Sequence, residues 1–240
     1  SIANFRLFNR VLTSDEIYQL YAYQKEYFGH GTLGMTLKGG RLGIGTSEPR
    51  AALDVRGRIL REYNPGEVIE ELHAVCASTS LRGKATIENV TALQNLTTSY
   101  TDATGSKVED YIIPEGTKTI VYEYTFHAKF DDAHAISHWK LFYQVNDGSY
   151  LEVIKARMDA SSQHYDQKKI CRWVFEVDAT VQDDSIGKLT ARAGDSFNVK
   201  WSVREYHSTN HEMTLHSNQY WDGSGTDQFA QPLIMIKAIA

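Results

Sequence analysis

The sequence predicts a mainly β protein whose residues 63–240 form an antiparallel β-sandwich of the jelly-roll type. Short segments in which apolar and polar residues alternate recur along these residues, as expected of strands that are buried on one face. Turn signals such as DATGS, NDGS and RAGD separate the segments, and no second amphipathic helix follows the one near the N-terminus. This pattern favours a sandwich or jelly roll over an α/β fold.

Residues 1–29 combine a short strand with a capped helix. Residues 2–8, IANFRLF, alternate as a strand does. Thr13 is placed to cap a helix and Glu16 to complete a capping box, after which apolar residues at helical spacing continue to about Gly29. The stretch FRLFNRVLTSDEIYQLY is similar to the C-terminal edge of laminin-G and concanavalin-like domains. That resemblance implies that residues 1–29 are the end of a lectin-like domain lying upstream.

Residues 30–62 form a glycine-rich segment that we call the collar. Glycine permits positive φ and close backbone approach, while Leu42, Ile44, Leu53 and Val55 supply apolar side chains at strand-like spacing. A segment this thin cannot bury its own apolar side chains, so self-association is the economical solution. LGIGTSEPRAALDVRG resembles the LGIGTxxPxxxLDVxG segment of phage tail fibres and of structural proteins of large algal viruses. The resemblance implies a shaft or collar and a homotrimer.

The strands expected in the C-terminal domain follow from alternation between turn signals. They cover residues 68–77, 84–90, 96–100, 108–113, 119–130, 138–145, 151–158, 170–179, 196–206, 213–221 and 233–239.

Composition excludes several classes of function. The chain has 25 Lys and Arg against 30 Asp and Glu, without a basic block, so nucleic acid is not an expected partner. No apolar run is long enough to span a bilayer. Cys76 and Cys171 form no disulfide framework or metal motif, and we expect both to be buried. Nucleophile, nucleotide-binding and calcium-loop motifs are absent, and HEMTLH has one residue too many for a zinc-protease signature.

Two polar clusters lie in the first half of the predicted sandwich and its central loops. In FDDAHAISHWK, the side chains of Asp132, His134 and His138 share one face if the segment is extended, which suits a divalent metal or a proton relay. A structural hydrogen-bond network is the commoner role, so no cofactor is expected. The loop RMDASSQHYDQKK offers Arg157, His164 and Tyr165 as substrate-binding groups.

A third cluster, residues 201–228, is the densest. In an extended strand Glu205 and His207 face one way while Arg204 and Tyr206 face the other. A lyase would use Tyr206 or His207 as the base and Arg204 to neutralise a uronate carboxylate. A hydrolase would instead use Glu205 with Glu212 or Asp222 as acid and base. We predict catalytic roles for Arg204, Glu205, Tyr206, His207, His211 and Glu212, and substrate-binding roles for Tyr220, Trp221 and Asp222. Ordinary hairpin surface is the alternative.

Residues 60–240 resemble a terminal domain of large algal DNA viruses, especially chlorella viruses. The resemblance is carried by PGEVIEELHAVC, LTTSYTDATGS, PEGTKTIVYEYTFHAKFDDAHAISHWK and HSNQYWDGSGTDQ. It implies a virion-associated, tail-fibre-like protein that binds and degrades host cell-wall polysaccharide. A non-catalytic receptor-binding or structural fibre tip is the second hypothesis. The sequons at Asn89 and Asn95 leave glycosylation open.

Overall fold

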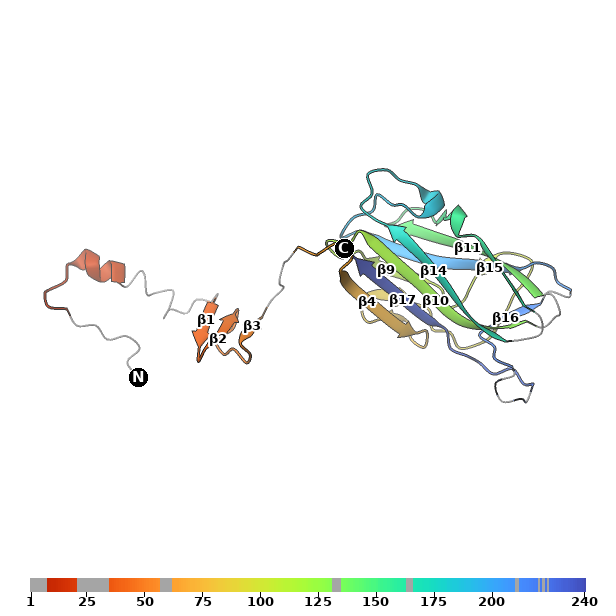
Figure 1. The fold of residues 1–240 in the computed structure, drawn as a ribbon, viewed down its shortest axis with the longest axis horizontal. Helices are drawn as coiled ribbons and strands as arrows, with labels where there is room; N and C mark the ends of the chain where they lie inside the picture. Colours follow the sequence, from red (N-terminus) through yellow and green to blue (C-terminus); the bar gives the residue numbers. More distant parts are fainter. Residues whose placement is uncertain are drawn as a thin grey trace. The chain divides into compact units, whose positions relative to one another are not determined.

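A computed structural model describes residues 8–20, 35–56, 62–130, 135–162, 166–209, 212–219, 221, 223 and 225–240. The chain divides into two compact units, Ser1–Arg61 and Glu62–Ala240. The architecture is mainly β, as the sequence predicts, and the larger unit contains antiparallel sheets consistent with a β-sandwich (Figure 1).

In the first unit, residues 14–20 are helical and begin with the expected capping box. The Thr13 N–H donates to Glu16 Oε2 at 2.9 Å, and the Glu16 N–H donates to Thr13 Oγ1 at 3.3 Å. Residues 2–7 of the strand expected over 2–8, and the helix beyond Leu20, fall outside the described residues, and Phe8 is not in a strand.

The collar contains a small sheet of three strands in the order β1 (Met35–Lys38), β2 (Arg41–Ile44) and β3 (Leu53–Val55). Two of its glycines are required by close backbone approach. A Cβ on Gly43 would lie 2.7 Å from the Thr46 carbonyl oxygen, and one on Gly45 would lie 2.6 Å from that of Arg56. The GIG pattern is therefore a packing requirement of this turn.

The second unit is built from two sheets, which we call the front sheet and the back sheet. The front sheet has the order β4 (Val68–Val75), β17 (Leu233–Ile239), β10 (Thr119–Phe130), β16 (Met213–Leu215) and β7 (Gln94–Asn95), with β14 (Gln167–Glu176) also paired to β10. Figure 1 shows β4, β17, β10 and β14 side by side.

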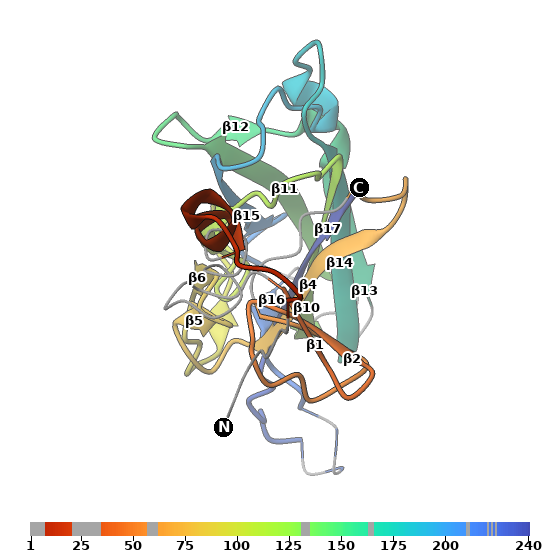
Figure 2. The same cartoon turned by 90° about the vertical axis from the view of Figure 1, so that its left-hand side faces the viewer.

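The back sheet has the order β12 (Leu151–Glu152), β11 (Ala135–Val145), β15 (Ser196–Glu205), β9 (Val108–Ile112), β6 (Ala85–Ile87) and β5 (Ser80–Leu81). Two further strands join it, β13 (Met158–Ser162) on β11 and β8 (Thr101–Asp102) on β15. Figure 2 shows β11, β15, β6 and β5 on one side of the unit, and β14, β17 and β4 on the other.

Aromatic side chains from both sheets fill the space between them. Phe126 of β10 stacks on Trp139 of β11 with ring centroids 5.0 Å apart, and Phe175 of β14 meets Phe197 of β15 edge-on at 5.1 Å. These contacts join the sheets face to face. Cys76 and Cys171 are buried free thiols, as expected.

Several expected strands are wrong in extent. The strand expected over residues 151–158 is interrupted by the 3-10 helix η1 (Ile154–Ala156). No strand covers residues 96–100. The Ser99 N–H there donates to the Thr97 hydroxyl at 3.4 Å and not to the backbone of a neighbouring strand. The strand from Met213 stops at Leu215 because His216 adopts a left-handed φ of 64°.

Candidate functional site

A pocket of about 430 Å³ lies on the outer face of the back sheet, and we call it the back-face pocket. Its lining comes from β11, from β13 and from three residues outside the strands, so no single stretch of sequence contains it. The lining residues are Tyr100, Ile136, His138, Trp139, Arg157, Met158, Asp159 and Tyr206.

Strand alternation directs the Ile136 and His138 side chains to this outer face, whereas the Trp139 side chain points into the core. Along β15 the odd-numbered residues from Phe197 to Glu205 are buried against the core, so Arg204 and the following Tyr206 point outward. The β11 register sets His138 opposite Arg204 on one side and opposite Asp159 of β13 on the other. The rings of His138 and Tyr206 lie 5.7 Å apart.

Tyr100 carries two cations on its ring. The Nζ atom of Lys140 lies 4.6 Å from the ring centroid, and the guanidinium carbon of Arg204 lies 5.5 Å from it. Tyr100 and Tyr206 are both exposed, at 40% and 52% of their surface. The outer face thus offers two accessible aromatic rings beside positive charge.

The two arginines of this face differ in their partners. Arg157 donates from Nε to Glu152 Oε1 at 2.6 Å, which raises the pKa of the guanidinium and lowers that of the Glu152 carboxyl. Lys140 also contacts Glu152, at 3.5 Å. Among the described residues, Arg204 pairs with no carboxylate and donates only to the Glu205 backbone carbonyl, at 3.3 Å.

Other predicted site residues lie elsewhere. Glu205 is buried on the core side of β15, and burial, followed by the neighbouring Glu212 carboxylate, raises its pKa. Its orientation separates it from Arg204 and Tyr206. His207 is exposed beyond the strand, where its Nδ1 accepts from the Thr209 N–H at 3.2 Å. Trp221 is exposed in the loop between β16 and β17.

Seven of the residues predicted for a metal, catalytic or substrate-binding role fall outside the described part of the chain. They are Asp132, His134, His164, Tyr165, His211, Tyr220 and Asp222. Within the described ranges, no group of three or more His, Cys, Asp or Glu side chains is arranged to hold a metal ion. The helices of the described residues include none that is both long and apolar enough to cross a membrane.

Comparison with known proteins leaves the family open. No protein-family model matches the sequence, and no curated protein matches it. Among solved structures, the chain is similar to Eiger TNF from S. frugiperda with a TM-score of 0.30 and 12% identity, over 74% of this chain and 94% of that one. A similarity this low carries no argument about function.

Proposed function

We propose that this chain is a virion-associated attachment protein whose C-terminal sandwich binds an acidic polysaccharide of the host algal cell wall. Tyr100 and Tyr206 line the back-face pocket and the Arg204 guanidinium lies over the Tyr100 ring, and this arrangement carries the proposal. The resemblance of residues 60–240 to algal-virus terminal domains supplies the biological setting.

Each part of this face matches a part of a uronic acid. The C–H face of a sugar ring stacks on an aromatic platform, which Tyr100 and Tyr206 provide. The sugar carboxylate needs a cation that is not already neutralised, and a guanidinium binds it through two parallel hydrogen bonds. Arg204 meets that need better than Arg157, because Glu152 already occupies Arg157.

Sedimentation of the full chain with isolated algal cell walls tests the proposal. We expect saturable binding that soluble pectate, a polyuronate, competes away. Arg204→Gln and Tyr100→Ala should each weaken wall binding about tenfold, equivalent to about 1.4 kcal/mol. Arg172→Gln removes an exposed arginine from the outer face of the front sheet and should change nothing. Equal binding by Arg204→Gln and wild type would contradict the proposal.

A second candidate function, cleavage by β-elimination, is favoured by the environment of His138. Its Nε2 atom is shielded from solvent and has no hydrogen-bond partner among the described residues. It lies beside Tyr206 and opposite Arg204. In this reaction the sugar displaces the groups that shield Nε2, His138 takes the C5 proton, the C4–O bond breaks as the C4=C5 bond forms, and Tyr206 protonates the leaving oxygen. Arg204 stabilises the negative charge that develops on the carboxylate.

The cleavage hypothesis predicts an unsaturated, ultraviolet-absorbing product from pectate or from algal walls. His138→Ala should abolish that product and leave wall binding within about twofold of wild type. Reducing sugar without an unsaturated product would favour the hydrolase assignment of Glu205 and Glu212. Wall binding without any product would leave the attachment function alone.

We also propose that the collar holds the chain as a homotrimer. Met35, Leu37, Ile44 and Leu53 are exposed on its small sheet, at 68%, 78%, 40% and 56% of their surface. Contact between copies of the collar would bury these apolar side chains and so stabilise the assembly. Light scattering of the full chain should give the mass of three chains, and a monomer at micromolar concentration would contradict trimerisation.

A further inference from the structure

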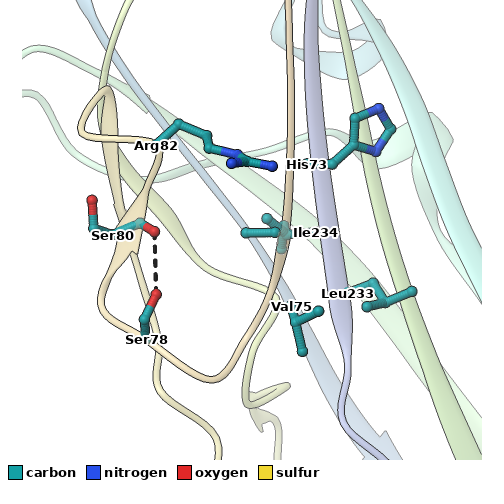
Figure 3. Close-up of a pocket in the computed structure, with 8 residues that line it drawn as sticks. His73, Val75, Ser78, Ser80, Arg82, Leu233 and Ile234 are labelled. Atoms are coloured by element: carbon teal, nitrogen blue, oxygen red, sulfur yellow. Dashed lines mark hydrogen bonds between the residues drawn. The ribbon is translucent and has the colours of Figure 1, made fainter.

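A second pocket, of about 470 Å³, lies at the edge of the front sheet, and we call it the edge pocket. It is formed where the ends of β4 and β17 approach the β5–β6 hairpin. Figure 3 shows Val75, Leu233 and Ile234 on the strand side of the pocket, with Arg82 and His73 above them. The pocket therefore has an aliphatic floor and a basic rim.

The hairpin turn fixes the position of Arg82. The Lys84 N–H donates to the Leu81 carbonyl at 3.0 Å, and φ is positive at both Arg82 (55°) and Gly83 (71°). These are features of a type I′ turn, whose first central position favours Asn or Gly. An arginine there costs about 1 kcal/mol of backbone strain. The turn directs the guanidinium across the pocket toward His73 (Figure 3).

Charge in this region is balanced except at Arg82. Glu71 accepts from Lys237 at 2.8 Å and contacts His73 Nε2 at 2.8 Å, while Glu70 pairs with Lys84 at 3.5 Å. Among the described residues no carboxylate pairs with Arg82. Its guanidinium therefore has hydrogen-bonding capacity for an anion from outside the chain.

The aliphatic floor of the edge pocket does not suit a sugar. None of the residues that line the edge pocket is tyrosine, tryptophan or phenylalanine, so a sugar ring has no aromatic platform there. Aliphatic side chains instead favour an apolar chain that displaces water from Val75 and Leu233, which are exposed at 50% and 39% of their surface, while Ile234 is buried beneath. The volume lies in the range of small-molecule pockets.

We propose that the edge pocket binds a small carboxylate that carries a branched apolar chain. The carboxylate bonds to the Arg82 guanidinium, and the chain lies on the aliphatic floor. Neither group alone fills the pocket, so a ligand that lacks either one should bind more weakly. This site does not depend on polysaccharide binding.

Two-dimensional NMR of the isotopically labelled full chain, titrated with 4-methylpentanoate, tests the proposal. We expect saturable shifts at Val75, Leu233 and Ile234. 4-Methylpentan-1-ol, which lacks the charge, and acetate, which lacks the chain, should each bind at least tenfold more weakly. Arg82→Asn is the chosen variant because Asn suits the left-handed turn position, so it removes the guanidinium while preserving the hairpin. It should weaken 4-methylpentanoate binding at least tenfold, and Arg204→Gln should leave it unchanged.

Three outcomes would overturn the proposal. Equal binding of the acid and the alcohol would reduce the site to an apolar patch. Unchanged binding by a folded Arg82→Asn variant would remove the role of the guanidinium. Binding of an acetylated peptide that ends in leucine, at least tenfold tighter than 4-methylpentanoate, would replace the small acid with a peptide C-terminus.

Discussion

The back-face pocket and the edge pocket are built from similar polar groups on different floors. Their volumes are about 430 and 470 Å³, and an arginine and a histidine line each of them. The back-face pocket adds Tyr100 and Tyr206, with Arg204 over the Tyr100 ring, whereas the edge pocket adds Val75, Leu233 and Ile234. We propose that cations select for an anion in both pockets and that the floor decides whether a sugar or an alkyl chain accompanies it.

Protonation of His216 should have the largest effect, a loss of folding stability, and it limits the pH range in which the two pockets can be compared. Burial lowers the pKa of His216 from 6.5 to about 4. The unfolded chain then binds the proton more tightly than the folded chain. The contribution of neutral His216 to the free energy of unfolding is therefore complete above pH 6.5 and is lost as the pH falls toward 4. The loss is about 3 kcal/mol.

Denaturant unfolding between pH 7.5 and pH 4 measures this loss. His216→Asn, which tolerates the left-handed backbone, should give a flatter dependence of stability on pH than wild type. Parallel curves for the two proteins would contradict the role of His216. Binding at either pocket is then best compared above pH 6.5.

Charge reversal should separate the pockets most clearly. Arg204→Glu places a carboxylate where the sugar carboxylate would bind and should weaken pectate binding about thirtyfold, or about 2 kcal/mol. Arg82→Glu should change pectate binding less than twofold. Isothermal titration calorimetry measures both, and equal losses in the two variants would mean that general surface charge governs binding.

Removing part of each floor should have a smaller effect. Tyr100→Ala deletes a sugar platform and the ring under Lys140 and Arg204, so we expect about tenfold weaker binding to an oligouronate. Leu233→Ala should leave that affinity unchanged. Affinity electrophoresis in pectate gels ranks the variants, and equal mobility of Tyr100→Ala and wild type would show that the ring is not a platform.

Changes in the collar should have the smallest effect on the affinity of an individual pocket. Leu37→Asp combined with Leu53→Asp places charge on its exposed apolar face and should prevent trimerisation. The affinity of each back-face pocket for a short oligouronate should stay the same, while avidity for intact walls falls. Unchanged wall binding by a monomeric double variant would contradict a contribution from trimers.

Local signals predicted the capped helix and the long strands because they depend on neighbouring residues. Thr13 and Glu16 form their box within one turn, and β10 matches its predicted bounds from Thr119 to Phe130. His216 shows the limit of this reasoning. MTLHSNQYW suits a strand, but the left-handed backbone at His216 ends it.

The candidate site was harder to predict because it is assembled across strands. Alternation along β15 correctly separated Arg204 and Tyr206 from Glu205. The approach of Tyr100 to Arg204 depends on the pairing of β8 with β15, which connects residues about a hundred positions apart. Asp159 faces His138 only through the register of β13 on β11. The spacing of residues along the sequence indicates neither of these two contacts.

The most direct test of the central claim compares pectate with the same polymer after methyl esterification. The sugar rings are retained while the carboxylate charge is removed, so calorimetry on both polymers isolates recognition of the anion by the back-face pocket. We predict that wild type binds pectate at least tenfold more tightly than the ester and that Arg204→Gln loses this preference. Equal affinity of the wild type for both polymers, or an unchanged preference in Arg204→Gln, would contradict the account.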